Sequence, residues 1–294
     1  MQFRTLALAT TSLVALGLAA QANAANQMMG DINFGYGHNW ENFEEGGSSS
    51  DNEHPSIFGQ GRVNLPYSDT VNLQLDAVGR TSLDTREGFF AGKTANAGYF
   101  ALGGHLNYRD DDGMLGVFAA TGRVNDFYFN GAAVYLAGFE GQYYCGPWTF
   151  RGQLAYLDSD EFSLLSNAGL ARVGANYYIG KNLKLTADLA YVDGDAADSS
   201  STYDSEQWGW GLGVHYWFGK SIPASAFIDY RGRDVETRDG GSPEEIDHQS
   251  VNFGVRFHFA ATGSPTPTRT ARRPTFRTWI CTGCGTDVTL MAGW

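Results

Sequence analysis

Charged and polar side chains recur at every second position in many segments of this chain, with apolar side chains between them. In the segment from Ser250 to Phe259, the odd-numbered residues are valine or phenylalanine, and the even-numbered ones include Arg256 and His258. A period of two is that of a β-strand with one apolar and one polar face. Rings of charge around a hydrated interior select ions, so the charged face is the first candidate for function.

If such strands close into a barrel with the polar face inside, the same phase, applied to the other alternating segments, predicts a set of inward-facing ionisable residues. Basic members outnumber acidic ones, which predicts a preference for anions or acidic solutes. The alternative is that these charges pair across the interior and close a narrow barrel. The predicted set is Arg62, Asp76, Arg80, His105, Glu140, Arg151, Arg172, Lys184, Asp188, His215, Asp229, Arg231, Arg256 and His258.

Hydrolytic chemistry would need a histidine beside an orienting or nucleophilic group. Two neighbouring pairs could supply an aspartate and a histidine, namely Asp51 with His54 and Asp247 with His248. Such pairs arise easily by chance in acidic segments. The inward phase of the other histidines does not suit a lipase, which would need its site at the lipid-facing rim. We therefore expect no catalytic residues and no enzyme.

The acidic segments 41–55, 193–206 and 234–249 are predicted to be long loops. Clustered carboxylates can bind hard divalent cations, or bridge through them to lipopolysaccharide. The simpler interpretation is a solvated, self-repelling surface, and we favour it. We expect neither a metal site nor a cofactor.

Three cysteines are present. Cys281 and Cys284 have the spacing of a redox or zinc motif, but the βαβ context and the further ligands that those functions need are missing. A disulfide in an oxidising compartment, or two idle thiols, is the better interpretation. Cys145, the odd cysteine, is either free or paired with the C-terminal segment.

Twelve segments show the alternation of a strand, each about nine to fourteen residues long, which suits tilted membrane strands. The predicted strands are Asp31–Trp40, Ser56–Leu65, Thr70–Thr81, Ala95–Tyr108, Gly113–Gly122, Gly131–Tyr144, Trp148–Asp158, Ala168–Ile179, Leu183–Val192, Gln207–Gly219, Ala224–Arg233 and Val251–Phe259. Their connections alternate between short turns and longer loops. This order indicates the periplasmic and extracellular ends of an outer-membrane barrel.

The two ends of the chain differ from the middle. Residues 1–24 predict a secretory signal peptide, with Arg4 before an apolar run and Ala22-Asn23-Ala24 as cleavage site. Residues 260–294 are basic and rich in proline and threonine, and we expect a disordered periplasmic tail. Between them, residues 25–259 carry 15 basic and 31 acidic residues, a net charge of −16, which argues against a nucleic-acid partner.

The signal peptide, the twelve alternating strands, the alternating connections and the aromatic final strand together resemble Gram-negative porin-like outer-membrane β-barrel proteins. The resemblance is architectural and covers residues 25–259. It implies an all-β antiparallel transmembrane barrel in the outer membrane, in contact with lipid and lipopolysaccharide, as a monomer or a homotrimer. It also implies passive diffusion of small polar solutes or ions. A non-conducting structural or surface-interaction barrel is the alternative, and an outer-membrane hydrolase is the third.

Overall fold

A computed structural model describes residues 28–45, 48–84, 86–87, 94–95, 98–125, 132–159, 165–197, 202–219, 222–238 and 243–260. The predicted signal peptide and nearly all of the predicted tail lie outside these residues. None of the described residues forms a helix long and apolar enough to cross a membrane.

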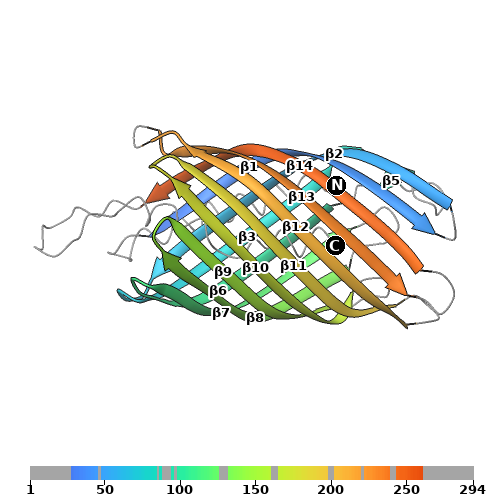
Figure 1. Cartoon of the computed structure of the whole chain (residues 1–294), viewed down its shortest axis with the longest axis horizontal. Helices are drawn as coiled ribbons and strands as arrows, with labels where there is room; N and C mark the ends of the chain where they lie inside the picture. The colour runs from blue at the N-terminus through green and yellow to red at the C-terminus, as the bar shows by residue number, and fades with distance from the viewer. Residues whose placement is uncertain are drawn as a thin grey trace, which may run out of the picture.

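Twelve antiparallel strands close into a single barrel (Figure 1). They are β1 (Met29–Glu45), β2 (Ser48–Pro66), β3 (Val71–Ser82), β6 (Gly98–Arg109), β7 (Gly113–Asn125), β8 (Ala132–Cys145), β9 (Trp148–Ser159), β10 (Ser166–Ile179), β11 (Leu183–Ala197), β12 (Thr202–Trp217), β13 (Ala224–Arg238) and β14 (Pro243–Ala260). A two-stranded hairpin of β4 (Arg86–Glu87) and β5 (Thr94–Ala95) lies in the connection between β3 and β6. The predicted fold class is confirmed, and each of the twelve predicted strands overlaps one strand of the barrel.

The chain meets itself where the first barrel strand pairs with the last. β1 and β14 run antiparallel over their whole lengths, from Met29 opposite Ala260 to Glu45 opposite Glu244. Closure leaves no open sheet edge, which is the condition that the hydrocarbon region of a membrane imposes on strands. The interior is therefore enclosed by one chain.

The strands are longer than predicted at the end that carries the long connections. β1 and β2 are separated only by residues 46–47, so the predicted loop 41–55 is almost entirely strand. The predicted loops 193–206 and 234–249 likewise belong mostly to β11 to β14. These loop predictions were wrong because the strands continue beyond the apolar band. Both faces there meet water, so the ladder persists while the apolar alternation is lost.

The outer face of the wall is apolar and exposed. Leu115 on β7 is 72% exposed, and Phe139 on β8 is 70% exposed. Many other large apolar side chains on the outward phase are similarly uncovered, while polar side chains such as Asp31 and Asn33 are buried inside. An apolar exterior of this extent would be a liability in water and suits a wall surrounded by lipid.

Candidate functional site in the barrel interior

The strand pairings place the predicted ionisable residues on the inner face of the wall. Asp31 lies opposite Arg62, which lies opposite Asp76, so three neighbouring strands point these charges inward. Arg231 and Asp229 on β13 lie opposite Ser250 and Asn252 on β14 in the same phase. These pairings establish where the residues lie. Their role in selectivity stays a prediction.

One group of these residues forms a buried ionic network near the short turns. The Nε of Arg62 donates to Asp76 at 3.0 Å, and the two ring nitrogens of His105 lie 3.0 Å from Asp76 and 3.0 Å from Glu140. Gln74 also donates to Asp76, at 2.9 Å. All four ionisable side chains are almost fully buried. An imidazolium donates from both nitrogens, so the arrangement matches two positive groups with two carboxylates.

A second group continues the network along the wall. Arg172 donates to Asp188 at 2.7 Å, and Arg151 lies 3.8 Å from the other oxygen of that carboxylate. Other predicted residues lie as follows: His215 lies 3.2 Å from Asp229, Arg256 lies 3.5 Å from Asp31, and His258 lies 3.0 Å from the hydroxyl of Ser225. Lys184 lies opposite His215 on the next strand, and Arg80 and Arg231 line the cavity described next.

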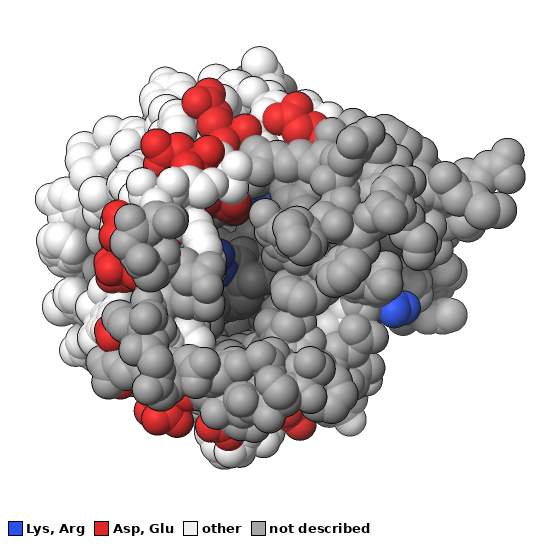
Figure 2. Space-filling view, turned by 90° about the vertical axis from the view of Figure 1, so that its right-hand side faces the viewer, with Lys and Arg blue, Asp and Glu red and all other residues white. Residues whose placement is uncertain are grey.

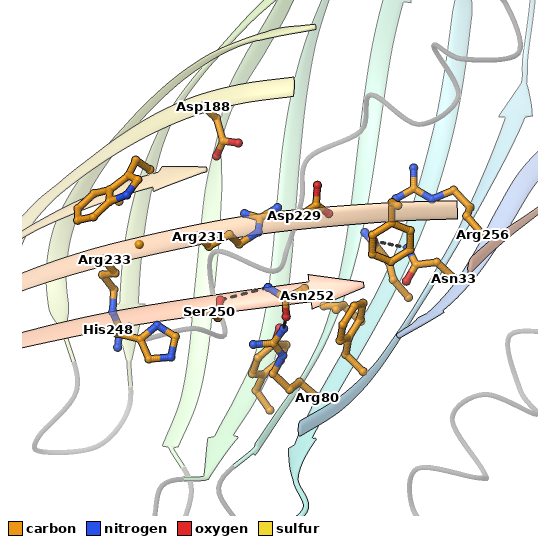
Figure 3. Close-up of a pocket in the computed structure, with 18 residues that line it drawn as sticks. Asn33, Arg80, Asp188, Asp229, Arg231, Arg233, His248, Ser250, Asn252 and Arg256 are labelled. Carbon is orange, nitrogen blue, oxygen red and sulfur yellow. Dashed lines mark hydrogen bonds between the residues drawn. The ribbon is translucent and has the colours of Figure 1, made fainter. Parts of the chain in front are cut away.

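A partly open cavity of about 100 Å³ lies inside the barrel (Figure 3). Its lining includes four guanidinium groups, from Arg80, Arg231, Arg233 and Arg256, but only two carboxylates. The carboxylates belong to Asp188 and Asp229, which already have the partners described above. Among the side chains that line the cavity, guanidinium groups therefore outnumber carboxylates, and Arg256 also has Asp31 as a partner. Polar side chains such as Asn33, Ser250 and Asn252 complete its lining.

Two phenylalanines form an apolar surface in the cavity, which we call the Phe platform, and their ring planes are inclined at 48° to one another. Phe58 on β2 lies opposite Gly35 on β1, Gly35 lies opposite Gly254 on β14, and Gly254 lies opposite Phe227 on β13. A Cβ atom on either glycine would collide with the neighbouring phenylalanine ring, so the rings lie over the bare glycine backbone. The ring centroids of the two phenylalanines are 6.1 Å apart. Phe58, Phe227, Gly35 and Gly254 thus make one continuous patch across four strands.

Part of the inner wall is apolar, which sequence reasoning did not anticipate. Leu136 on β8 lies opposite Leu157 on β9 on the inward phase, and Leu170 on β10 lies opposite Val192 on β11. These residues join a buried cluster with Val78, Tyr99, Ala101, Phe118, Val134, Leu165 and Ala168. The expectation of a polar interior is therefore wrong for the inner face of β6 to β11 near the long connections.

Sequence reasoning also missed two basic residues of the cavity. Arg233 and His248 lie opposite one another on β13 and β14 and line the cavity. The sequence pattern predicts a loop at residue 248 and the end of a strand at residue 233. The signal that could have found them is the unbroken inward phase from Asp229 through Arg231.

Three acidic side chains converge on the outer face of the same strands, beyond the apolar band. Oxygen atoms of Asp234, Glu245 and Asp247 lie within 4.8 Å of one another. Burial and the charges of Asp247 and Glu236 raise the pKa of Asp234, and the charge of Asp234 raises the pKa of Glu245. Red side chains surround the opening at this end, and blue atoms lie deeper within it (Figure 2). The positive interior is thus approached past an acidic rim.

The pairs that sequence reasoning considered for hydrolysis are not dyads. Asp247 and His248 are adjacent on β14, so their side chains leave opposite faces of the wall. Asp51 and His54, three positions apart on β2, diverge in the same way. Cys145 is exposed at the end of β8, while Cys281 and Cys284 lie outside the described residues.

Comparison with solved structures shows the fold. The chain is 12% identical to an outer-membrane channel from Pseudomonas putida F1, with a TM-score of 0.55, and the match covers 79% of this chain and 95% of that one. A FadL homologue from Pseudomonas aeruginosa matches with 10% identity and a TM-score of 0.46, over 81% and 93% of the two chains. An anion-selective porin from Comamonas acidovorans matches with 11% identity and a TM-score of 0.38, over 80% and 100%.

No family model matches the chain, and no curated protein matches it. At such identities the structural likeness establishes the fold alone. The fold is that of outer-membrane β-barrel proteins, and the structural neighbours include channels.

Proposed function

We propose that this protein is a passive channel of the outer membrane that admits small polar solutes and ions and prefers anions. The observation that carries the proposal is the cavity inside the closed barrel, where four guanidinium groups face two carboxylates. Positive groups in a cleft with low-dielectric walls raise the local concentration of anions. No cofactor takes part, and the pathway lies within one chain, so either a monomer or a homotrimer could conduct.

The buried ionic network limits where solutes can pass. Twelve strands enclose only a modest lumen. The side chains of Arg62, Asp76, His105 and Glu140 fill part of the space near the short turns and are hardly exposed. A solute would therefore travel beside the arginine-rich wall of β13 and β14 rather than along the network.

Single-channel recording tests the proposal. The refolded chain, inserted in a planar bilayer under a salt gradient, should give discrete conductance steps and a reversal potential on the anion side. A refolded barrel that never conducts would contradict a channel function. A cation-side reversal potential would contradict the role of the positive wall.

A second candidate is a barrel that contacts its surroundings through the acidic outer ends of β13 and β14. The observation in its favour is the convergence of Asp234, Glu245 and Asp247 on the outward face, beyond the apolar band. Divalent cations could bridge such carboxylates to the phosphates of lipopolysaccharide. Magnesium-dependent binding of purified lipopolysaccharide, lost when Asp234 and Asp247 are both changed to asparagine, would support this candidate; binding that does not depend on magnesium or on these residues would refute it.

A further inference from the structure

We propose that the cavity binds small carboxylates that carry a planar apolar group, a proposal that rests on the channel function above and names its solute class. The planar group would lie on the Phe platform, and the carboxylate would meet the guanidinium groups beside it. Two different observations support this site. One is the apolar surface of the Phe platform, and the other is the positive charge of the guanidinium groups beside it. Both lie within the same cavity.

The shape comes from the Phe platform. Gly35 and Gly254 are paired at the centre of the row, so the two rings come together over the glycine backbone. Gly37, two residues from Gly35 on β1, lies close to side chains of Asn252 and Ser56, so the polar surface resumes at once beyond the platform. Two inclined rings with a polar border suit a planar ring, which can meet one of them face to face and the other with its edge. It does not suit a hydrated inorganic anion, which would gain nothing from the apolar area.

The charge comes from arginines placed over both ends of the platform. The guanidinium carbon of Arg80 lies 5.1 Å from the ring centroid of Phe58, and that of Arg256 lies 5.9 Å from the centroid of Phe227. A guanidinium above a ring keeps its in-plane N–H groups directed sideways, where a carboxylate can accept two of them. The platform thus supports the arginines as well as offering an apolar face.

Neutral partners hold one of these arginines in position. Arg80 donates to the amide oxygens of Asn39, at 3.2 Å, and of Asn252. These two amides are uncharged and orient the guanidinium. Figure 3 shows Arg80 and Asn252 joined in this way, with Arg231 on β13 and Arg256 on β14, the strand of Asn252, around the same space. A carboxylate can therefore approach from more than one direction.

The apolar surface continues on the next two strands. Val78 on β3 and Tyr99 on β6 line the cavity and also belong to the buried apolar cluster of the inner wall. Phe58 lies opposite Arg80, which lies opposite Tyr99, so an arginine stands between two aromatic rings in the same row. The cavity thus presents apolar surface and positive charge side by side, a combination that fits an amphipathic anion better than a uniformly polar one.

The test uses three probes of chloride current through the full chain in planar bilayers. Benzoate carries both the ring and the charge, acetate only the charge, and benzyl alcohol only the ring. Benzoate should block half of the current at a concentration about tenfold lower than acetate, which corresponds to about 1.4 kcal/mol. Benzyl alcohol at the same concentration as benzoate should not block.

Replacement of the platform sharpens the test. Changing both Phe58 and Phe227 to leucine keeps apolar volume but removes the planar faces. In this variant, the concentration of benzoate that blocks half of the current should rise close to that of acetate. Phe139→Leu is the matched control, because that ring is on the outer face of β8 and 70% exposed. Phe139→Leu should leave the difference between the two anions as it is in the parent chain.

The outcomes separate this inference from the channel function. A chloride preference together with equal block by benzoate and acetate would overturn the amphipathic site and leave the channel standing. If no current is seen, saturation-transfer NMR of benzoate with the detergent-refolded barrel tests binding at the site independently of conduction. Ring-proton transfer that the double leucine variant abolishes supports the site, and absence of transfer to the parent barrel overturns it.

Discussion

Two regions of the inner wall use the same residue types in different ways. In the network on β2, β3, β6 and β8, two cationic side chains meet two carboxylates at hydrogen-bonding distances, and all are buried. In the cavity on β3, β13 and β14, four arginines face two aspartates around an open space. Matched and buried charge holds a wall together, whereas unbalanced charge beside a cavity acts on whatever enters it.

The difference explains why charge alone does not identify a pore. Arg62 and Arg231 both point inward, but Arg62 is 2% exposed and its charge is met by Asp76. The contrast predicts that mutations in the network should change stability, whereas mutations in the cavity should change which ions pass. The following experiments test that division from the largest expected effect to the smallest.

The largest effect is expected from removing a charge inside the network. Asp76→Asn leaves Arg62 and His105 without their shared carboxylate, and the free energy of unfolding should fall by about 3–5 kcal/mol. Urea unfolding of the refolded barrel in detergent measures it. Asp193→Asn, on an exposed outward position of β11, serves as control and should stay within about 0.5 kcal/mol of the parent. A loss below about 1 kcal/mol for Asp76→Asn would remove the distinction between the regions.

A methyl group placed under the Phe platform should have an intermediate effect. Gly35→Ala puts a Cβ atom against the ring of Phe58 and should destabilise the barrel by about 1–3 kcal/mol, because the ring must move. Gly169→Ala is the matched control on β10, since a Cβ atom there meets nothing within 4 Å. If both variants unfold at the same urea concentration, the platform is not packed as described.

The smallest effect is expected outside the lumen, in the acidic group on the outer ends of the strands. Asp234 lies opposite Asp247, and Asp234→Asn should stabilise the barrel by a few tenths of a kcal/mol at pH 7. The folded protein raises the pKa of Asp234, so its contribution is favourable below the ordinary pKa and is lost as pH rises through the folded value.

The advantage of Asp234→Asn should therefore vanish in acid, below about pH 4, where the native residue is protonated. Unfolding midpoints of the two proteins, compared at pH 3 and pH 7, measure this. An advantage of equal size at both pH values would show that repulsion is not its cause.

The sequence predicts the strands well and the site only in part. Alternation is strong wherever one face meets lipid, so Leu183–Val192 and Val251–Phe259 both lie within observed strands. It disappears where both faces meet water, and the outer half of β13 and β14 was therefore assigned to a loop. The Phe platform depends on register, because Phe58 and Phe227 meet only through the pairing of Gly35 with Gly254. A single sequence shows which residues of a strand share a face. It does not show which residue of the neighbouring strand each of them lies opposite.

The most direct test of the account is the reversal potential of single channels under a potassium chloride gradient. The parent chain should favour chloride, and changing both Arg231 and Arg233 to glutamate should move the reversal potential toward the cation side. Arg123→Glu, on an exposed outward position of β7, makes one such reversal of charge, half of the change in the double variant, away from the cavity and should leave the preference unchanged. A preference that does not respond to Arg231 and Arg233, or that shifts equally with Arg123, would contradict the role assigned to the cavity.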